Sequence, residues 1–151
     1  MAPTTPARRR RDPHRRERTI AAAVEVIGET GPASLTHRTA AARAGVPLGS
    51  TTYYFADLDE LFSAAVRTVA ERNVARPREW ANALPEQADL CAELAEFLVL
   101  LTTRHRQSTV LAYELYGIAL RRPALRSAST AWDDMLSAVF ALRLDDAKAS
   151  L

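Results

Sequence analysis

Apolar side chains recur at helical spacing along most of the chain. In residues 14–29 they fall at i, i+3, i+4 and i+7, a pattern that places them on one face of an amphipathic helix. These positions are Ile20, Ala23, Val24 and Ile27. Gly31 and Pro32 follow, and this pair predicts the end of the helix, because glycine accepts the backbone conformation of a helix exit and proline does not continue the helix.

The same spacing predicts further helices over residues 58–74, 86–103, 106–120 and 124–142. Asp57 stands where it can cap the first of these, and Pro123 separates the last two. Asp145 is expected to begin a short final segment. No stretch alternates apolar and polar residues in the way that half-buried strands do, so the predicted fold class is all-α.

Two short helices joined by a tight turn are predicted between residues 36 and 55. Thr36 is a favourable N-cap for the first helix, and Gly45 can supply a positive φ at its exit. Pro47 suits the first turn of the second helix, which covers residues 48–55. This second helix is rich in threonine, tyrosine and glycine, which favour helix poorly, so its side chains are expected to serve contacts outside the helix.

Such a pair of helices predicts a helix-turn-helix, whose second helix lies in the major groove of DNA. Hydroxyl groups on that helix can bond to bases or phosphates, and Thr36 lies at a helix N-terminus, which favours a phosphate. His37 fits a position beside a phosphate and a plain surface position equally well. Tyr53 and Tyr54 point in different directions on a helix, so at least one is expected to be exposed, while Phe55 is the better core residue. The expected DNA contacts are Thr36, His37, Arg38, Leu48, Gly49, Ser50, Thr52, Tyr53 and Tyr54.

These residues also carry a resemblance to the DNA-binding domain of the TetR (tetracycline-repressor) family of regulators. The matching anchors are Arg18 to Ala23, Gly31, Leu35 with Thr36 and Arg38, Ala44 to Val46, Gly49 to Phe55, and Leu61. The resemblance implies three N-terminal helices for DNA, followed by a helical bundle that binds a small effector and forms a dimer. It also implies that Thr36 contacts a phosphate, that Gly49, Ser50, Thr52, Tyr53 and Tyr54 lie on the recognition helix, and that Phe55 is buried.

Three features depart from the pattern of that family. Leu58 stands where the family usually has a lysine that binds phosphate, and Ala40 stands where it usually has a large aliphatic residue. The sequence also ends where the last dimerising helix is expected to begin. These departures predict a shortened C-terminus, weaker dimerisation and different local packing around Ala40.

The charge of the chain is unevenly distributed. Residues 1–55 contain nine Arg and four acidic residues, whereas residues 56–151 contain eleven Lys or Arg and fourteen acidic residues. Four consecutive arginines, Arg8, Arg9, Arg10 and Arg11, lie in a Pro-rich stretch that predicts a disordered arm able to contact DNA phosphates. The predicted domains are this arm (1–13), a helix-turn-helix domain (14–57) and a helical effector-binding and dimerisation domain (58–151).

The sequence shows no sign of a membrane protein, a metal or cofactor site, or an enzyme. No apolar run is long enough to span a bilayer, and the basic N-terminus lacks the apolar region of a secretory signal, so we expect a cytoplasmic protein without a membrane partner. The single cysteine, Cys91, predicts no internal disulfide, and no spacing predicts a metal site or a cofactor. No catalytic motif is present, so we do not expect an enzyme.

Aromatic and apolar side chains in the second domain are candidates for an effector pocket, although simple bundle core explains each of them as well. They are Trp80, Phe97, Leu101, Tyr113, Tyr116, Trp132 and Phe140. The sequence therefore predicts a homodimeric transcriptional regulator, a repressor that binds a palindromic double-stranded operator and is released by a small-molecule effector. The alternative is a helical dimerisation or interaction module that does not bind specific DNA on its own.

Overall fold

The computed structural model describes residues 14–85 and 87–149, with side chains described as far as residue 141. Its α-helices are α1 (Arg15–Thr30), α2 (His37–Ala44), α3 (Leu48–Tyr54), α4 (Leu58–Ala83), α5 (Leu90–Thr103), α6 (Arg106–Arg121) and α7 (Arg126–Ala149). Two 3₁₀ turns, η1 (Pro32–Ser34) and η2 (Pro123–Leu125), complete them. No strand occurs in the described residues, which confirms the all-α prediction. The arginine arm, Arg8 to Arg11, lies outside them.

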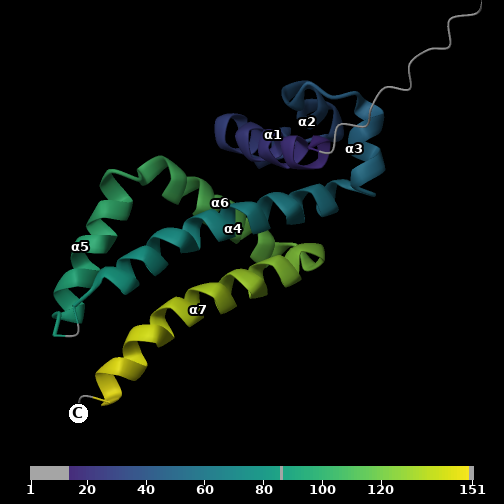
Figure 1. Cartoon of the computed structure of the whole chain (residues 1–151). Coiled ribbons are helices and arrows are strands. Elements are labelled where there is room, and N and C mark those ends of the chain that lie inside the picture. The colour runs from purple at the N-terminus through teal and green to yellow at the C-terminus, as the bar shows by residue number, and fades with distance from the viewer. Residues whose placement is uncertain (1–13, 86, 150–151) are drawn as a thin grey trace, which may run out of the picture.

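The helices form two parts that α4 joins (Figure 1). Helices α1, α2 and α3 cluster at one end. Only three residues separate α3 from α4, which runs through the middle of the molecule. Helix α7 lies along α4, α6 packs against both, and α5 contacts α6. Helix α4 therefore belongs to both parts of the molecule. None of the described helices is long and apolar enough to cross a membrane.

Local hydrogen bonds define the helix-turn-helix. The Thr36 hydroxyl accepts from the Thr39 backbone N–H at 3.0 Å, and the Thr39 hydroxyl accepts from the Thr36 N–H at 2.9 Å, which is a capping box. Gly45 ends α2 with φ +63°, as predicted, and the Val46 N–H donates to the Ala41 carbonyl at 3.1 Å. Ala40 is fully buried in the core cluster that includes α1, so the small residue at this position allows close packing of α2.

The acid–base pairs of this domain lie at its surface. Arg43 on α2 pairs with Glu25 on α1 at 3.3 Å and makes a second, bidentate pair with Glu29. The hydrogen bond from Arg43 lowers the pKa of Glu29 below its usual value.

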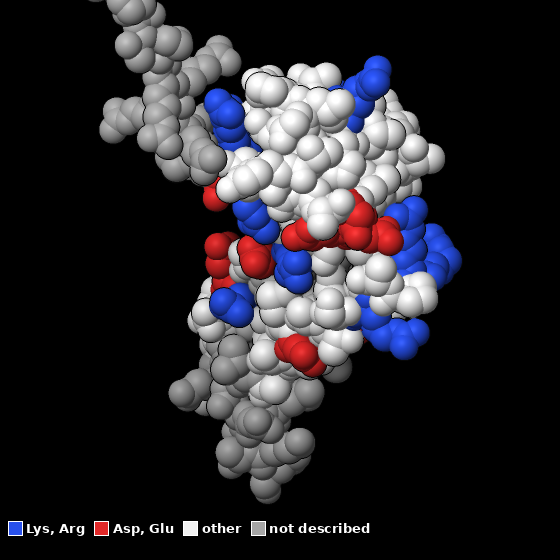
Figure 2. Space-filling model, turned by 90° about the vertical axis from the view of Figure 1, so that its right-hand side faces the viewer, with Lys and Arg blue, Asp and Glu red and all other residues white. Residues whose placement is uncertain are grey.

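Figure 2 looks onto the side of the molecule that carries α3, and its upper lobe is largely free of charged side chains, with basic groups at the margins and acidic groups below. On this face, charged side chains therefore lie around the upper lobe more than on it.

Helix boundaries differ from the sequence prediction by more than two residues at three places. Helix α4 does not stop at Val74 but continues to Ala83, because Val74, Pro77 and Ala81 extend its buried face. Helix α5 begins at Leu90 instead of residue 86, since the Asp89 carboxylate accepts from the N–H groups of Cys91 and Ala92.

The break expected at Asp145 is also wrong, and α7 is continuous to Ala149. Asp145 and Asp146 are tolerated because Ala, Leu and Lys around them are strong helix formers.

The turn glycine gives a stability prediction with an internal control. Gly45→Ala is expected to lower the free energy of unfolding by about 1 kcal/mol, because an L-residue is strained at positive φ. Gly49 has a helical φ and open space where a Cβ would stand, so Gly49→Ala is expected to stabilise α3 by about 0.8 kcal/mol. Urea unfolding of both variants measures the two effects. A stable Gly45→Ala variant would contradict the requirement for a left-handed residue at the turn.

Candidate nucleic-acid interface and ligand cavity

Helix α3 presents one side to the core and the other to solvent. Only Thr51 of its seven residues is buried, and Phe55, directly after it, is fully buried. On the outer side, Tyr53 is 68% exposed and Leu48 is 45% exposed. Gly49 and Thr52 are exposed, whereas Ser50 and Tyr54 are half-buried. The sequence prediction of a buried Phe55 and an exposed tyrosine is confirmed.

The tyrosines on this side form a small aromatic surface. The rings of Tyr53 and Tyr54 meet edge to face, with centroids 5.1 Å apart and an interplanar angle of 82°. Both rings, with Arg15, Pro47, Gly49 and Ser50, line a surface hollow of about 350 Å³. Arg15 was not among the predicted contacts, and its Nη1 donates to Ser50 Oγ at 3.4 Å. Nothing in the sequence pattern indicates that the first residue of α1 meets α3, since 35 residues separate the two side chains.

The N-terminus of α2 supplies the remaining predicted contacts. The Thr36 hydroxyl is already engaged in the capping box, so the structure assigns it first to fixing the helix. His37 is half-buried, and its Nδ1 is buried without a hydrogen-bond partner among the described residues. Arg38 is exposed. At this end of α2, Arg38 therefore offers the exposed cationic side chain.

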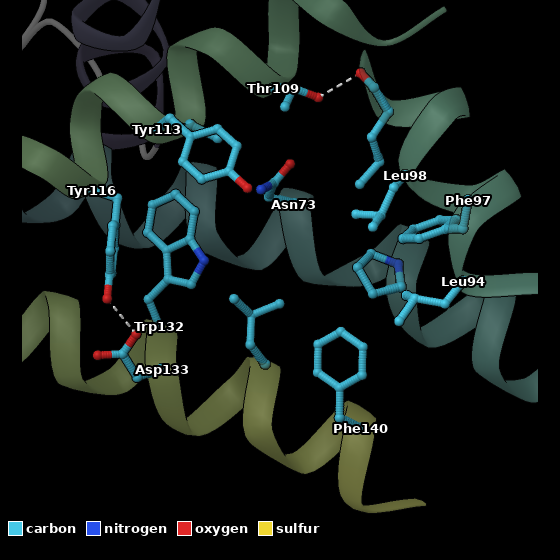
Figure 3. Close-up of a pocket in the computed structure, with 14 residues that line it drawn as sticks. Asn73, Leu94, Phe97, Leu98, Thr109, Tyr113, Tyr116, Trp132, Asp133 and Phe140 are labelled. Atoms are coloured by element: carbon cyan, nitrogen blue, oxygen red, sulfur yellow. Dashed lines mark hydrogen bonds between the residues drawn. The ribbon is translucent and has the colours of Figure 1, made fainter. Parts of the chain in front are cut away.

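A cavity of about 250 Å³ lies between α4, α5, α6 and α7 (Figure 3). Among the predicted pocket residues, Phe97, Leu101, Tyr113, Tyr116, Trp132 and Phe140 line it. Trp80 does not line it but stacks on Phe97, with ring centroids 5.0 Å apart. The lining residues that the sequence analysis did not predict are Asn73, Pro77, Leu94, Leu98, Thr109, Ala112, Asp133 and Leu136. Their helical spacing is the same as that of core residues, so periodicity does not distinguish them.

The wall of this cavity is aromatic with one acidic group. Tyr116 donates a 2.7 Å hydrogen bond to Asp133, and its ring meets Trp132 edge to face at 5.4 Å. Asp133 is the one carboxylate among the lining residues, and none of them is basic. The hydrogen bond to Asp133 raises the pKa of Tyr116, because the phenolate would lose the bond and face a second negative charge. The cavity thus combines π-faces with a negative charge at its rim.

A basic side chain connects the cavity helices to the start of α4. Arg122, at the junction of α6 and η2, pairs with Asp59 at 3.1 Å and lies over the ring of Phe62 at 4.8 Å. Asp59 stands in the first turn of α4, whose cap residue Asp57 is three residues beyond α3. Cavity residues flank this junction in the chain: Tyr113 and Tyr116 on α6 before it, and Trp132 and Asp133 on α7 after it. Arg122 thus links the chain segment between the cavity residues of α6 and α7 to the first turn of α4.

An all-helical chain with an N-terminal helix-turn-helix and a cavity in a second helical part has the organisation of a one-component regulator. Residues 85–150 match the family model described as Tetracyclin repressor-like, C-terminal domain. The multidrug binding protein EbrR, in its crystal structure with imidazole, is 45% identical with a TM-score of 0.77, and the match covers 92% of this chain and 82% of that one. The chain belongs to the TetR family of transcriptional regulators.

Further relatives agree with this assignment. A member of the TetR family from Streptomyces coelicolor A3, SCO1917, is 48% identical with a TM-score of 0.71, over 87% of this chain and 76% of that chain. The HTH-type transcriptional regulator BetI of Stenotrophomonas maltophilia (strain R551-3) is 41% identical over 58 residues. That match covers 38% of this chain and 30% of BetI. EbrR has also been crystallised with ethidium, malachite green and proflavin.

The Tyr116–Asp133 pair gives a titration prediction. In Asp133→Asn, the pKa of Tyr116 is expected to fall back toward the ordinary tyrosine value, because the carboxylate that favours the protonated phenol is gone. Any stability from this pair is present below the unfolded tyrosine pKa and is lost as pH rises through the higher folded value. The titration is followed by tyrosinate absorbance against pH. The difference from the Tyr116→Phe variant gives the contribution of Tyr116. Asp134→Asn is the matched control and is expected to leave the titration unchanged.

Proposed function

We propose that this chain is a DNA-binding transcriptional repressor that a small-molecule effector releases from its operator. The proposal rests on the two sides of α3. Thr51 is buried on the inner side, and the outer side is exposed to solvent at Leu48, Gly49, Thr52 and Tyr53. A helix packed in this way can insert its outer side into a major groove while its inner side stays packed on the core. The hydroxyl-rich outer face suits hydrogen bonds to phosphates and base edges.

The proposed assembly is a homodimer on a palindromic site. Two copies of α3 in successive major grooves require a separation of about 34 to 36 Å, and two-fold symmetry of the protein then implies two-fold symmetry of the operator. An effector that favours a different separation shifts the population away from the DNA-binding form. The path through Arg122, Asp59 and Phe62 supports such coupling, because it joins the cavity helices to the turn that follows α3.

The DNA-binding proposal is tested by selection from a random duplex library, with sedimentation of the protein alone and with the selected DNA. A dimer that enriches a palindromic sequence is expected. Tyr53→Ala should lower affinity for that sequence by about fivefold to 150-fold, since loss of an exposed contact of this kind costs about 1 to 3 kcal/mol, while thermal stability stays near wild type. A monomer that binds all duplexes alike, with strong salt sensitivity, would refute the proposal.

We further propose that the effector is an aromatic cation. The cavity offers the rings of Phe97, Tyr113, Tyr116 and Trp132, and π-faces attract a delocalised positive charge. Asp133 adds a carboxylate at the rim. Ethidium, malachite green and proflavin, with which the related EbrR was crystallised, are aromatic cations, and this supports the same ligand class here.

Ligand binding is tested with ethidium and proflavin, read out by quenching of Trp132 fluorescence with Trp80 replaced by Phe. Asp133→Asn is expected to weaken binding of both dyes about threefold to tenfold, a modest effect because the carboxylate is solvent-exposed. Asp134→Asn removes the same charge one residue along, outside the cavity lining, and should bind as wild type. Equal loss in both variants would mean that bulk charge, and not the cavity, governs binding.

The alternative is an interaction module that pairs with another helical protein and has no specific DNA binding of its own. Exposed apolar residues on α5 favour it, since Leu98 is 50% and Val99 is 60% exposed. The sedimentation experiment separates the two functions. An interaction module would remain a monomer that selects no duplex, whereas the repressor would form a dimer on its operator.

A further inference from the structure

The surface of α3 lacks the positive charge that DNA binding needs. Its sequence from Leu48 to Tyr54 contains no ionisable acid or base other than tyrosine. Most of the affinity of proteins for DNA comes from cations that neutralise phosphates, so a cation must approach α3 from another element. The residues that line the hollow beside α3 include one such group, Arg15 at the start of α1.

We propose that Arg15 binds a phosphate of the DNA backbone beside the recognition helix, and that Ser50 positions its guanidinium and does not read a base. The inference rests on the proposed function, because it takes α3 as the element that enters the groove. It assigns a DNA contact to α1 and changes the role expected for Ser50.

The geometry of the hollow supports this assignment. Arg15 is half-buried, and its Nη1 makes a long hydrogen bond of 3.4 Å to Ser50 Oγ. A guanidinium has five N–H donors in a planar fork, so one bond to serine leaves donors for two phosphate oxygens. The rings of Tyr53 and Tyr54 and the backbone of Gly49 form the other walls, which leaves the hollow without a competing acid.

The neighbouring cation has a different environment. Arg16 lies over the buried Phe55, with its guanidinium carbon 5.5 Å from the ring centroid, so its side chain is engaged with the scaffold. Arg15 also makes a tertiary contact, but its partner Ser50 lies on α3 itself and beside the surface hollow. A side chain fixed in this way loses less conformational freedom on binding than a free surface arginine.

The roles of Arg15 and Ser50 predict different mutant behaviour. A phosphate contact holds the protein in register but carries no sequence information. Arg15→Gln should therefore weaken binding to all duplexes alike and lower the salt slope. Ser50→Ala should weaken binding to all duplexes by a smaller factor, because the guanidinium is less well placed, and should leave the base preference unchanged.

The experiment measures affinity against salt concentration for the full chain, on the selected operator and on a scrambled duplex of equal length. Arg15→Gln is expected to reduce affinity about tenfold on both duplexes, and to reduce the magnitude of the slope of log K against log salt by about 0.9 per contact. Arg15→Lys should keep the slope with weaker affinity, since lysine supplies the charge without the planar fork. Arg72→Gln, an exposed arginine of α4 outside the hollow, is the matched charge control and should keep the wild-type slope.

Two results would overturn the proposal. One is a wild-type slope in Arg15→Gln on both duplexes, with circular dichroism showing an intact fold. The other is an altered base preference at one operator position in Ser50→Ala, which would make Ser50 a base contact. If selection yields no operator, the proposed repressor function fails, and the slope on the scrambled duplex still decides whether Arg15 binds phosphate.

Discussion

The burial of Thr51 and Phe55 is the constraint on which the outer surface of α3, the proposed DNA-binding surface, depends. Helix α3 has seven residues and poor helix formers, so it would not be stable in isolation. Thr51 and Phe55, each fully buried, hold it against the core, and the Thr51 hydroxyl donates to the Leu48 carbonyl at 2.8 Å. With stability supplied from the inner side, the outer side is free to carry hydroxyl and aromatic groups that contribute little to folding.

The sequence predicted this domain well because its signals are local. Thr36 as N-cap, Gly45 at positive φ, buried Phe55 and the Asp57 cap all follow from the chemistry of single residues or close neighbours. Contacts between distant segments could not be predicted in the same way. The approach of Arg15 to Ser50 depends on how α1 packs over the turn, and no periodicity encodes that distance.

The second part was predicted less completely for a related physical reason. A cavity wall and a close-packed core both need apolar side chains at helical spacing, so the sequence identifies candidates but does not show which of them enclose space. Phe97 lines the cavity while Trp80 stacks behind it, although both are aromatic residues in neighbouring helices. Helix ends were also misplaced where burial, and not propensity, decides the boundary, as at the C-terminal end of α4.

Pro77 gives α4 an uneven stiffness along its length. Proline has no N–H, so the carbonyl of Asn73, four residues earlier, lacks the donor that holds the other turns of the helix. Asn73 and Pro77 both belong to the cavity wall, whereas the first turn of α4 is clamped by Arg122. Helix α4 therefore lacks one backbone hydrogen bond at the cavity wall, while an ion pair joins its first turn to the junction of α6 and η2. A bend of α4 at this point would also shift its first turn, which Arg122 ties to the cavity helices and which only three residues separate from α3.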